Sequence, residues 1–509
     1  MTQNYISRVL DLFARYGHAE AIVADDRRLT YHELITGTLS IAAALHREGV
    51  RPGVAVGALA STEPEAVLLQ FAVHLMGGRI AWIAPNSPAA FRERFLKHAE
   101  VDIFVYDARQ YAEVGAKLAA GTDRPVFCLG AGGVGPDLVA GPPVGRIADL
   151  PFDLSEVTTE PQALFQTSGT TGQPKLVHHT QRFFETALAF AAHYTASGQH
   201  QMKHLALGGF WVVSSQMPAH MALLTGGTYY TVSAFDTAGF LELIARERIT
   251  DTLLTPPVLY FLLDYPAFAT ADTSSLLRVN VGGAPVASSR LAQAIERLGP
   301  VLRTAYGMSE APIISAYQNI PNDPAVLASV GQPYGDLKLE IRDPAGAPLP
   351  VGEVGEVWLS GGVMMAGYWG QPELTAETLV DGWLRTGDVG YVDPTGNLFL
   401  VDRVKDMILT GWGSTNIFAR PIEDLLAAHP GVRAAAVVGV PSEKYGEVVH
   451  GYVVGNPDVP VTGEELRELV LAELGAAWTP GEVEFIDAMP LTETNKVDKK
   501  ALRARYQAR

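Results

Sequence analysis

The stretch LFQTSGTTGQPK, residues 164–175, decides the fold of this chain. An apolar run ends at Phe165, six consecutive Ser, Thr and Gly residues follow, and the stretch closes on Lys175. Glycines let backbone N–H groups approach phosphate oxygens closely, while hydroxyl groups and a lysine supply further donors. A Walker A loop is excluded, because that motif has glycine directly before its lysine and Pro174 stands there. We interpret the stretch as a phosphate-binding loop after a buried strand; the alternative is a polar surface turn.

Short apolar runs alternate with amphipathic stretches on both sides of this loop. The apolar runs, expected as buried strands, include 54–59, 103–106, 252–255 and 279–281. The amphipathic stretches, with the spacing of helices, include 64–76, 239–247 and 288–298. This alternation predicts an α/β fold in which parallel or mixed sheets are covered by helices.

The pattern changes after about residue 330, where turn residues become dense. Short strands at 337–342, 355–360 and 397–401 predict an antiparallel, barrel-like β subdomain over about 331–402, within an N-terminal domain of residues 1–402. A small α+β domain is expected over 403–509, with the boundary near 403–406. Its expected elements are a helix at 421–429, strands at 434–440 and 447–454, and a helix at 463–474.

Composition limits the classes of partner. The formal net charge of −17 makes the chain a poor ligand for nucleic acids and argues against a polybasic membrane anchor. The single cysteine, Cys128, excludes a disulfide within the chain and a zinc site built from cysteines, and its apolar surroundings predict that it is buried. We find no secretory pattern at the N-terminus and no run of about 18 apolar residues, so we expect a soluble, cytoplasmic protein.

The glycine-rich stretch resembles the phosphate loop of the adenylate-forming superfamily, which includes acyl- and aryl-CoA ligases, nonribosomal peptide adenylation domains and firefly luciferases. Further segments resemble the motifs of that superfamily, in its order along the chain. They are Gly282-Gly283-Ala284-Pro285, Tyr306-Gly307-Met308-Ser309-Glu310, Arg385-Thr386-Gly387-Asp388, the run Asp402-Arg403-Val404-Lys405-Asp406, and Pro490 to Lys496.

The resemblance implies a role for each matched residue. The residues implied to bind ATP are Thr167, Ser168, Gly169, Thr170, Thr171, Gly172, Gly283, Ala284, Pro285, Tyr306, Gly307, Asp388 and Arg403. Those implied to be catalytic are Lys175, Ser309, Glu310 and Lys496. Glu310 would hold Mg²⁺, Asp388 and Arg403 would contact the ribose, and Lys405 would be the hinge between the domains. The implied cofactors are ATP, Mg²⁺ and coenzyme A.

Selectivity for the acid is expected to come from the segment 208–221 and two neighbouring turns. The residues expected to line the acyl pocket are Phe210, Trp211, Val213, Gly282, Met308 and Ile314. Members that activate amino acids carry an aspartate where Val213 stands, and no acidic residue occurs from 208 to 219, which disfavours α-amino acids. The Phe210-Trp211 pair favours an apolar or aromatic acid; packing of both rings in the core is the alternative.

Two departures from the family pattern bear on the second step. Asn495 stands where the family has glycine, a substitution that a turn with positive φ can accept. The segment after Asp406 has two additional residues before Asn416, Trp412 among them, and Ala419 and Pro421 replace the usual proline and glutamate. In the family this segment lines the tunnel for the acceptor.

The sequence therefore predicts a ligase that joins a carboxylic acid to ATP, releases pyrophosphate and transfers the acyl group to the thiol of coenzyme A. A carrier-protein phosphopantetheine, another small nucleophile, activation of a different oxyanion and luciferase-type oxygenation stay open as alternatives. A nucleotide-binding regulator without catalytic activity is the alternative from another class.

Overall fold

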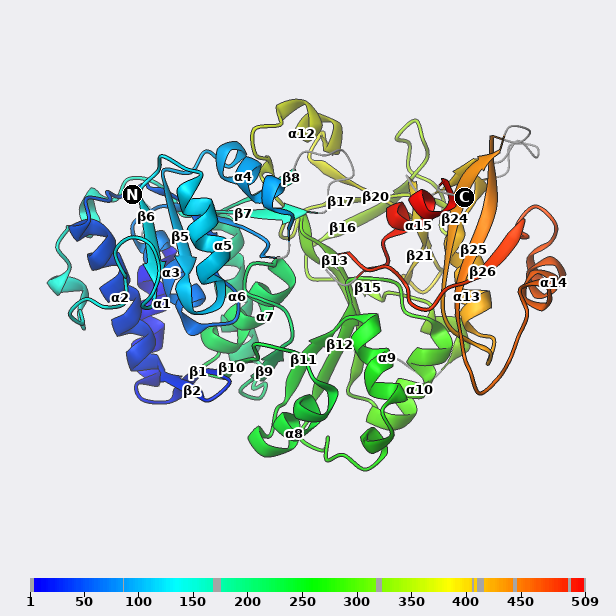
Figure 1. The fold of residues 1–509 in the computed structure, drawn as a ribbon, viewed down its shortest axis with the longest axis horizontal. Coiled ribbons are helices and arrows are strands. Elements are labelled where there is room, and N and C mark those ends of the chain that lie inside the picture. The colour runs from blue at the N-terminus through cyan, green and yellow to red at the C-terminus, as the bar shows by residue number, and fades with distance from the viewer. Residues whose placement is uncertain are drawn as a thin grey trace.

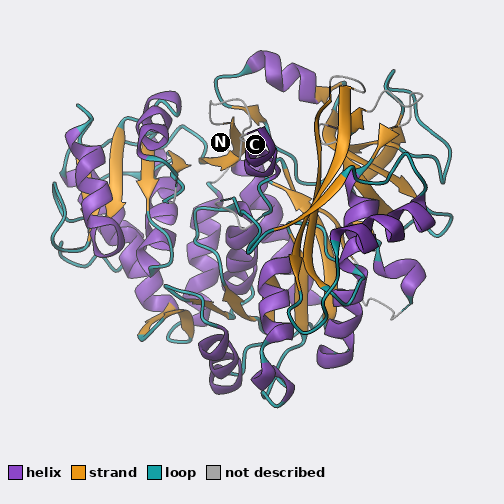
Figure 2. Cartoon of the chain, turned by 45° about the vertical axis from the view of Figure 1, so that its right-hand side comes forward, coloured by secondary structure: helices purple, strands orange, loops and turns teal. Residues whose placement is uncertain are grey.

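The computed structural model describes residues 4–85, 87–167, 175–316, 323–404, 407–409, 416–442, 446–492 and 496–507. Figure 1 shows an elongated molecule, with the N-terminus at one end of the long axis and the C-terminal strands β24–β26 toward the other. Figure 2, a turned view, shows the sheets flanked by helices. Among the described residues, no helix combines the length and the apolar character needed to cross a membrane.

The first sheet contains the strands on both sides of the glycine-rich loop. Its order in the described residues is β18-β8-β7-β4-β3-β5-β6. The strands are β3 (Ala55–Leu59), β4 (Arg79–Trp82), β5 (Ile103–Asp107), β6 (Val126–Leu129), β7 (Gln162–Thr167), β8 (Lys175–Thr180) and β18 (Gly367–Tyr368). Strands β3 to β7 run parallel, whereas β8 and β18 are antiparallel to their neighbours. The strands predicted at 54–59 and 103–106 are β3 and β5, and Cys128 is buried in β6 as expected.

The second sheet is also mixed. Its order is β15-β14-β13-β12-β11-β9-β10-β1-β2, parallel from β13 to β1 and antiparallel at both ends. The strands are β1 (Glu20–Ala24), β2 (Arg27–Thr30), β9 (Lys203–Ala206), β10 (Thr228–Thr231), β11 (Asp251–Leu254), β12 (Arg278–Gly282), β13 (Leu302–Met308), β14 (Ala311–Ala316) and β15 (Gln332–Pro333). The runs 252–255 and 279–281 were predicted as strands, and they form β11 and β12.

Helices cover both sheets. They are α1 (Tyr5–Tyr16), α2 (Tyr31–Arg47), α3 (Pro64–Leu75), α4 (Ala89–His98), α5 (Ala108–Ala120), α6 (Gln181–Ala196), α7 (Val213–Leu224), α8 (Thr237–Glu247), α9 (Pro256–Asp264), α10 (Ser288–Leu298) and α11 (Pro324–Leu327), with short 3₁₀ turns at Ile147–Asp149, Leu154–Glu156 and Pro266–Ala269. The amphipathic stretches predicted as helices form α3, α8 and α10. One core contains side chains of both sheets, with Trp82 from the first and Tyr229 from the second, so the two sheets share a single apolar interior.

The antiparallel subdomain predicted after residue 330 is confirmed. It consists of β16 (Lys338–Arg342), β17 (Gly355–Ser360), β19 (Leu379–Val380), β20 (Trp383–Val392) and β21 (Leu398–Arg403), with α12 (Pro372–Thr378) beside them. Every pairing in this sheet is antiparallel. Strand β18 leaves this region to join the first sheet at β8, which ties the two parts together.

The C-terminal residues form a small α+β unit. Its elements are β22 (Ile408–Leu409), β23 (Asn416–Ile417), α13 (Ala419–Ala427), β24 (Val432–Ser442), β25 (Gly446–Gly455), α14 (Gly463–Leu474), β26 (Glu482–Phe485) and α15 (Lys499–Gln507). Helix α13 begins two residues before the predicted 421–429, because the Asp402 carboxylate of β21 accepts a hydrogen bond from the backbone N–H of Ala419. Lys405 and Asp406 lie outside the described residues, and the boundary near them stays a prediction.

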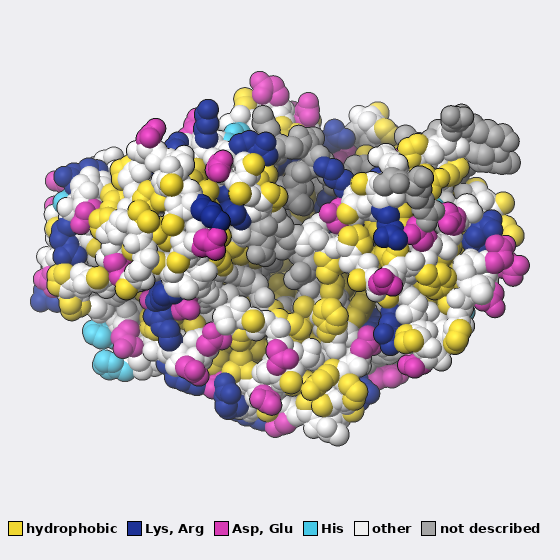
Figure 3. All heavy atoms as spheres, in the orientation of Figure 1, with side chains coloured by type: hydrophobic (Ala, Val, Ile, Leu, Met, Phe, Trp, Pro, Cys, Tyr) yellow, Lys and Arg dark blue, Asp and Glu magenta, His cyan; other side chains and the backbone are white. Residues whose placement is uncertain are grey.

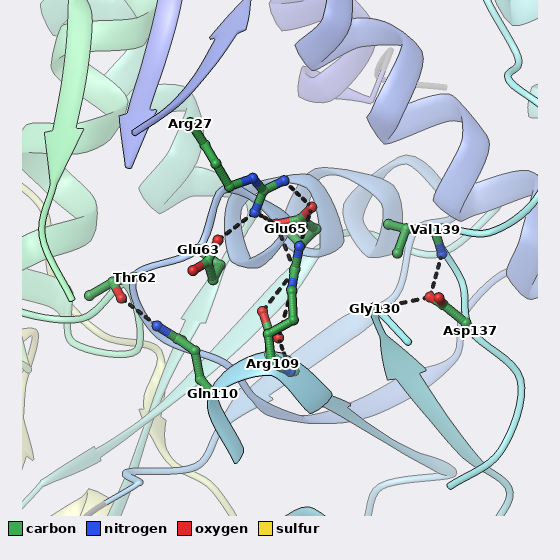
Figure 4. Close-up of polar contacts among 10 residues, drawn as sticks. Arg27, Thr62, Glu63, Glu65, Arg109, Gln110, Gly130, Asp137 and Val139 are labelled. Atoms are coloured by element: carbon green, nitrogen blue, oxygen red, sulfur yellow. Dashed lines mark hydrogen bonds and ion pairs between the residues drawn. The ribbon is translucent and has the colours of Figure 1, made fainter. Parts of the chain in front are cut away.

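An ion-pair cluster links the edge of the second sheet to the first. We call Arg27, Glu63, Glu65, Asp107 and Arg109 the Glu65 cluster. Figure 4 labels its members Arg27, Glu63, Glu65 and Arg109. The Glu65 carboxylate lies 2.7 Å from Arg27 Nη2 and 2.8 Å from Arg109 Nη2. Arg27 belongs to β2, Glu65 to α3, and Arg109 to α5 directly after β5. The cluster therefore holds the start of α3 between the two sheets.

Candidate active site

Three strands that are distant in sequence bring Tyr306, Asp388 and Arg403 together. Antiparallel pairing of β20 with β21 sets Asp388 opposite Arg403, and Arg403 Nε donates to Asp388 Oδ1 over 2.8 Å. The Tyr306 hydroxyl, from β13, donates to the other carboxylate oxygen. Three of the residues implied to bind ATP, the two ribose ligands among them, are thus directly connected.

A local irregularity in β20 aims Asp388 at this group. The register between β17 and β20 shifts between Glu356 and Trp358, which leaves residues 386–388 out of the regular ladder. Gly387 has φ +70°, a conformation that favours glycine. Thr386 Oγ1 accepts from the Asp388 backbone N–H at 3.0 Å and donates to the Val357 carbonyl at 2.8 Å. The Arg-Thr-Gly-Asp motif therefore encodes a bulge that presents its carboxylate.

Glu310, the predicted magnesium ligand, lies in the turn between β13 and β14. It is 7% exposed, and its Oε1 accepts a hydrogen bond of 2.7 Å from the Tyr368 hydroxyl. The ammonium nitrogen of Lys175 lies 5.3 Å from the centroid of the Tyr368 ring, a cation–π contact. Tyr368 was absent from the predicted site; only the structure shows that β18 brings it to β8, because no local pattern pairs these segments.

Burial sets the charge states around these groups. Burial, and after it the Asp388 carboxylate, raise the pKa of Tyr306 well above its ordinary value, so this phenol stays neutral. Burial opposes the charge of Arg403, but Asp388 together with Tyr306 and Glu310 outweighs burial, and the pKa of the guanidinium is raised. Burial lowers the pKa of His179 to about 4, so this ring is neutral near pH 7. Its Nε2 lies 2.8 Å from the carbonyl oxygen of Ser309 and holds the turn before Glu310.

The phosphate loop is anchored at both ends by one hairpin. Thr167 closes β7, Lys175 opens β8, and the two residues are paired across the antiparallel ladder. The predicted ligands Ser168, Gly169, Thr170, Thr171 and Gly172 lie outside the described residues. The described part confirms that a buried strand leads into the loop, and it adds a finding that was not predicted, that Lys175 faces Tyr368.

Two glycines allow neighbouring strands to approach closely beside Tyr306, Gly282 between β12 and β13 and Gly307 between β13 and β14. A Cβ added to Gly282 would lie 2.3 Å from the carbonyl oxygen of Ala305, and one added to Gly307 would lie 2.2 Å from that of Pro312. Gly283 has φ +85°, which explains the second glycine of the turn; Ala284 and Pro285 follow it before α10. Strand packing therefore requires glycine at positions 282 and 307, whether or not these residues also contact nucleotide.

The predicted acyl-pocket residues are mainly buried. Phe210 is 1% exposed and packs edge-to-face on Trp82, with ring centroids 5.6 Å apart. Val213, at the start of α7, lies in the same core, and Trp211 packs partly buried against it. Ile314 and Met308 lie in or against another core, that of the antiparallel subdomain. Phe210 therefore packs in the core. That the six predicted residues line an acyl pocket stays a prediction.

Lys496 precedes α15 on an exposed turn. Its backbone carbonyl accepts from the Thr492 N–H at 2.7 Å, and its N–H donates to Thr492 Oγ1 at 3.2 Å. Asn495 lies outside the described residues, as do Trp412 and the rest of residues 410–415. The catalytic role of Lys496 therefore stays a prediction.

The donor set suits ATP with Mg²⁺. The described residues contain no group of three or more His, Cys, Asp or Glu side chains that could by themselves hold a metal ion. Glu310 is a single buried carboxylate, and Tyr368 links it to Lys175. A single protein carboxylate is typical of sites where substrate phosphates and water supply the other ligands of Mg²⁺. Figure 3 shows a hollow in the middle of the viewed face, between the part that contains the first sheet and the part that contains β16, β17, β20 and β21.

Comparison with known proteins identifies the family. Residues 11–369 match the family described as AMP-binding enzyme, and residues 421–496 match the AMP-binding enzyme C-terminal domain. The medium/long-chain-fatty-acid–CoA ligase FadD8 of Mycobacterium tuberculosis is 34% identical, over 97% of this chain and 88% of the relative. Feruloyl-CoA synthase of an Amycolatopsis species is 33% identical, over 96% of each chain.

A solved structure agrees with this assignment. The amide bond synthetase McbA from Marinactinospora thermotolerans is 34% identical and superposes with a TM-score of 0.87, over 98% of this chain and 100% of that chain. The resemblance inferred from the motifs is therefore confirmed. The chain belongs to the AMP-binding enzyme family, and it is an AMP-forming ligase of the adenylate-forming superfamily.

Proposed function

We propose that this enzyme joins an apolar or aromatic carboxylic acid to ATP, forms the acyl-adenylate with release of pyrophosphate, and transfers the acyl group to the thiol of coenzyme A. The observation that supports it best is that side chains from separate motifs contact one another. Tyr306 and Arg403 both donate hydrogen bonds to Asp388. Tyr368 contacts both Glu310 and Lys175. A cytoplasmic location is part of the proposal.

The first half-reaction needs positioning and charge stabilisation, with no covalent bond to the enzyme. A carboxylate oxygen of the acid attacks the α-phosphorus of ATP, and the bond to the pyrophosphate oxygen breaks. Lys175 and the backbone of the phosphate loop would hold the phosphates, and Lys496 would neutralise the developing charge. Each Asp388 oxygen already accepts one hydrogen bond and keeps a lone pair for a ribose hydroxyl. Bound Mg²⁺ would supply charge neutralisation at the phosphates, with Glu310 as its ligand.

The second half-reaction would follow a rotation of the C-terminal domain, residues 403–509, about Lys405. The superfamily pattern supports this hinge, and rigid-body rotation about a short hinge is an ordinary domain motion. The rotation would withdraw Lys496 and open a path for the acceptor.

The proposed acid class follows from the apolar side chains around α7. Phe210, Trp211 and Val213 bring no charge to the predicted pocket, and a charged group on the acid would be costly to bury there without a partner. The names of FadD8 and feruloyl-CoA synthase, a fatty-acid ligase and an aryl-acid ligase, support an apolar or aromatic acid and coenzyme A as acceptor.

A second candidate is transfer to an amine. Two observations favour it: the match to an amide bond synthetase over the whole chain, and the altered segment between Asp406 and Glu423 where the family lines its acceptor tunnel. The acyl-adenylate is an activated ester that either a thiol or an amine can attack, so the first half-reaction is common to both candidates.

One experiment tests the proposal and separates the candidates. Fatty and aromatic acids are incubated with the purified enzyme, ATP and Mg²⁺, and pyrophosphate release is measured alone, with coenzyme A, with a phosphopantetheinylated carrier protein and with simple amines. Mass spectrometry identifies the product. An acyl-CoA thioester supports the proposal, an amide supports the second candidate, and acyl-AMP alone in every mixture refutes both acceptors. Lys496→Ala is the matched inactive control.

A further inference from the structure

Tyr368 reaches the predicted active site by an unusual route along the chain. It lies in β18, just after the antiparallel subdomain's β17, yet β18 pairs with β8 of the first sheet. The pairing sets Tyr368 opposite Val177, two residues from Lys175. Its backbone N–H donates to Thr375 Oγ1 at 2.9 Å, which joins it to α12. Its position is therefore fixed from two sides, by a sheet ladder and by a helix.

The side chain of Tyr368 has two distinct contacts. Its hydroxyl donates to Glu310 Oε1 at 2.7 Å, in a setting where Tyr368 is 8% exposed. Hydrogen bonds to an ionised acceptor away from water are the strong ones, and they fix the orientation of a carboxylate. The ring face lies 5.3 Å from the Lys175 ammonium, within the range of cation–π attraction. One residue thus touches both the predicted magnesium ligand and the lysine of the phosphate loop.

The hydroxyl of Tyr368 is the donor in its contact with Glu310, because an oxygen of an ionised carboxylate can only accept. The hydrogen bond uses Oε1 of Glu310, so it does not occupy Oε2. A carboxylate held at one oxygen is already oriented when a metal ion arrives.

We propose that Tyr368 is a positioning residue of the nucleotide site: its hydroxyl orients the Glu310 carboxylate toward Mg²⁺, and its ring holds Lys175 beside the phosphates. This inference rests on the proposed function, since the roles of Glu310 and Lys175 belong to it. The two contacts belong to different parts of the side chain, so two substitutions separate them.

Tyr368→Phe removes the hydroxyl and keeps the ring. The Mg²⁺ concentration for half-maximal ATP binding should rise about tenfold, because one hydrogen bond to a charged group is lost, while ATP affinity at saturating Mg²⁺ should stay within about twofold. Tyr368→Leu removes the ring as well, so ATP affinity should fall even at saturating Mg²⁺, by roughly threefold to tenfold. A general loss of structure would affect both quantities in both variants.

The experiment titrates the full-length enzyme with ATP at a series of Mg²⁺ concentrations by calorimetry, and repeats the series for acid-dependent pyrophosphate release. Tyr230→Phe is the matched control. Tyr230 lies in β10, and its hydroxyl also donates to a glutamate, with 3.3 Å to Glu20 Oε1. Thermal melting checks that all variants fold. The expected result is a Mg²⁺ shift in Tyr368→Phe and none in Tyr230→Phe.

An identical Mg²⁺ response of the wild type and Tyr368→Phe would overturn the inference and leave the proposed function standing. A wild type that binds ATP with Mg²⁺ but consumes no acid would refute the proposed function, and the binding series would still decide the role of Tyr368. A wild type that binds no ATP at any Mg²⁺ concentration would overturn both.

Discussion

Replacement of Glu65 by glutamine should destabilise the N-terminal part of the enzyme measurably. Glu65 is the centre of the Glu65 cluster, where its carboxylate is 6% exposed and contacts both Arg27 and Arg109. Glutamine has nearly the same shape but no charge, so Glu65→Gln weakens both ion pairs without creating a cavity.

The magnitude follows from the pKa of the carboxyl group. Burial opposes its ionisation, but hydrogen bonds from Arg27 and then Arg109 outweigh burial and lower the pKa of Glu65 from 4.5 to about 2. This difference corresponds to about 3 kcal/mol of folding free energy at pH 7. Because the side chains of Arg27 and Arg109 are 42% and 32% exposed, solvent screening reduces the expected loss in Glu65→Gln to about 2 kcal/mol.

The dependence on pH has a definite sign. Glu65 has a lower pKa in the folded state than in the unfolded state, so its stabilisation is complete above pH 4.5 and is lost as the pH falls toward about 2. The difference in unfolding free energy between the wild type and Glu65→Gln should be constant from pH 5 to pH 7, about 2 kcal/mol, and smaller at pH 4.

Urea unfolding, followed by circular dichroism across this pH range, measures the difference. Glu113→Gln is the control, since Glu113 pairs with Lys117 on the exposed face of α5 and its loss should leave the transition unchanged. Equal transitions for the wild type and Glu65→Gln at pH 7, or a difference that grows below pH 4.5, would refute the reasoning.

Three further predictions concern the site itself. Asp388→Asn should raise the KM for ATP about tenfold or more in a pyrophosphate-release assay, because it removes the charge opposite Arg403; an unchanged KM would contradict a role at the ribose. Gly282→Ala should lower the melting temperature, since its Cβ would lie 2.3 Å from a backbone carbonyl of β13, whereas Gly145→Ala, with open space around it, should not; equal melting would contradict the close packing. Lys496→Ala should reduce adenylation about a hundredfold or more while ATP binding by calorimetry changes little; full adenylation activity would refute the catalytic role of Lys496.

Much of the fold could be predicted from local patterns. Apolar runs and amphipathic stretches correctly located β3, β5, β11 and β12 and the helices α3, α8 and α10, because burial on a strand or on one helix face imposes a period that a short window shows. The exact start of α13 could not be predicted, since its first N–H is bound by Asp402, which lies 17 residues earlier on β21.

The candidate site divides in the same way. The motifs named Tyr306, Glu310, Asp388 and Arg403 by resemblance, and each is now found beside another of the set or beside Tyr368. Phe210, expected in the acyl pocket, packs against Trp82 in the core, because a large aromatic residue in an apolar segment serves packing as readily as ligand binding.

Residue types at short spacings in the sequence are sufficient to predict the family and the α/β architecture, and to nominate a phosphate loop. Which distant side chains meet is set by the packed structure. The hydroxyl of Tyr306 reaches Asp388 across 82 positions of sequence, and that of Tyr368 reaches Glu310 across 58. Such contacts depend on strand pairing and register, which are set by the packing of whole sheets and leave no local period in the sequence.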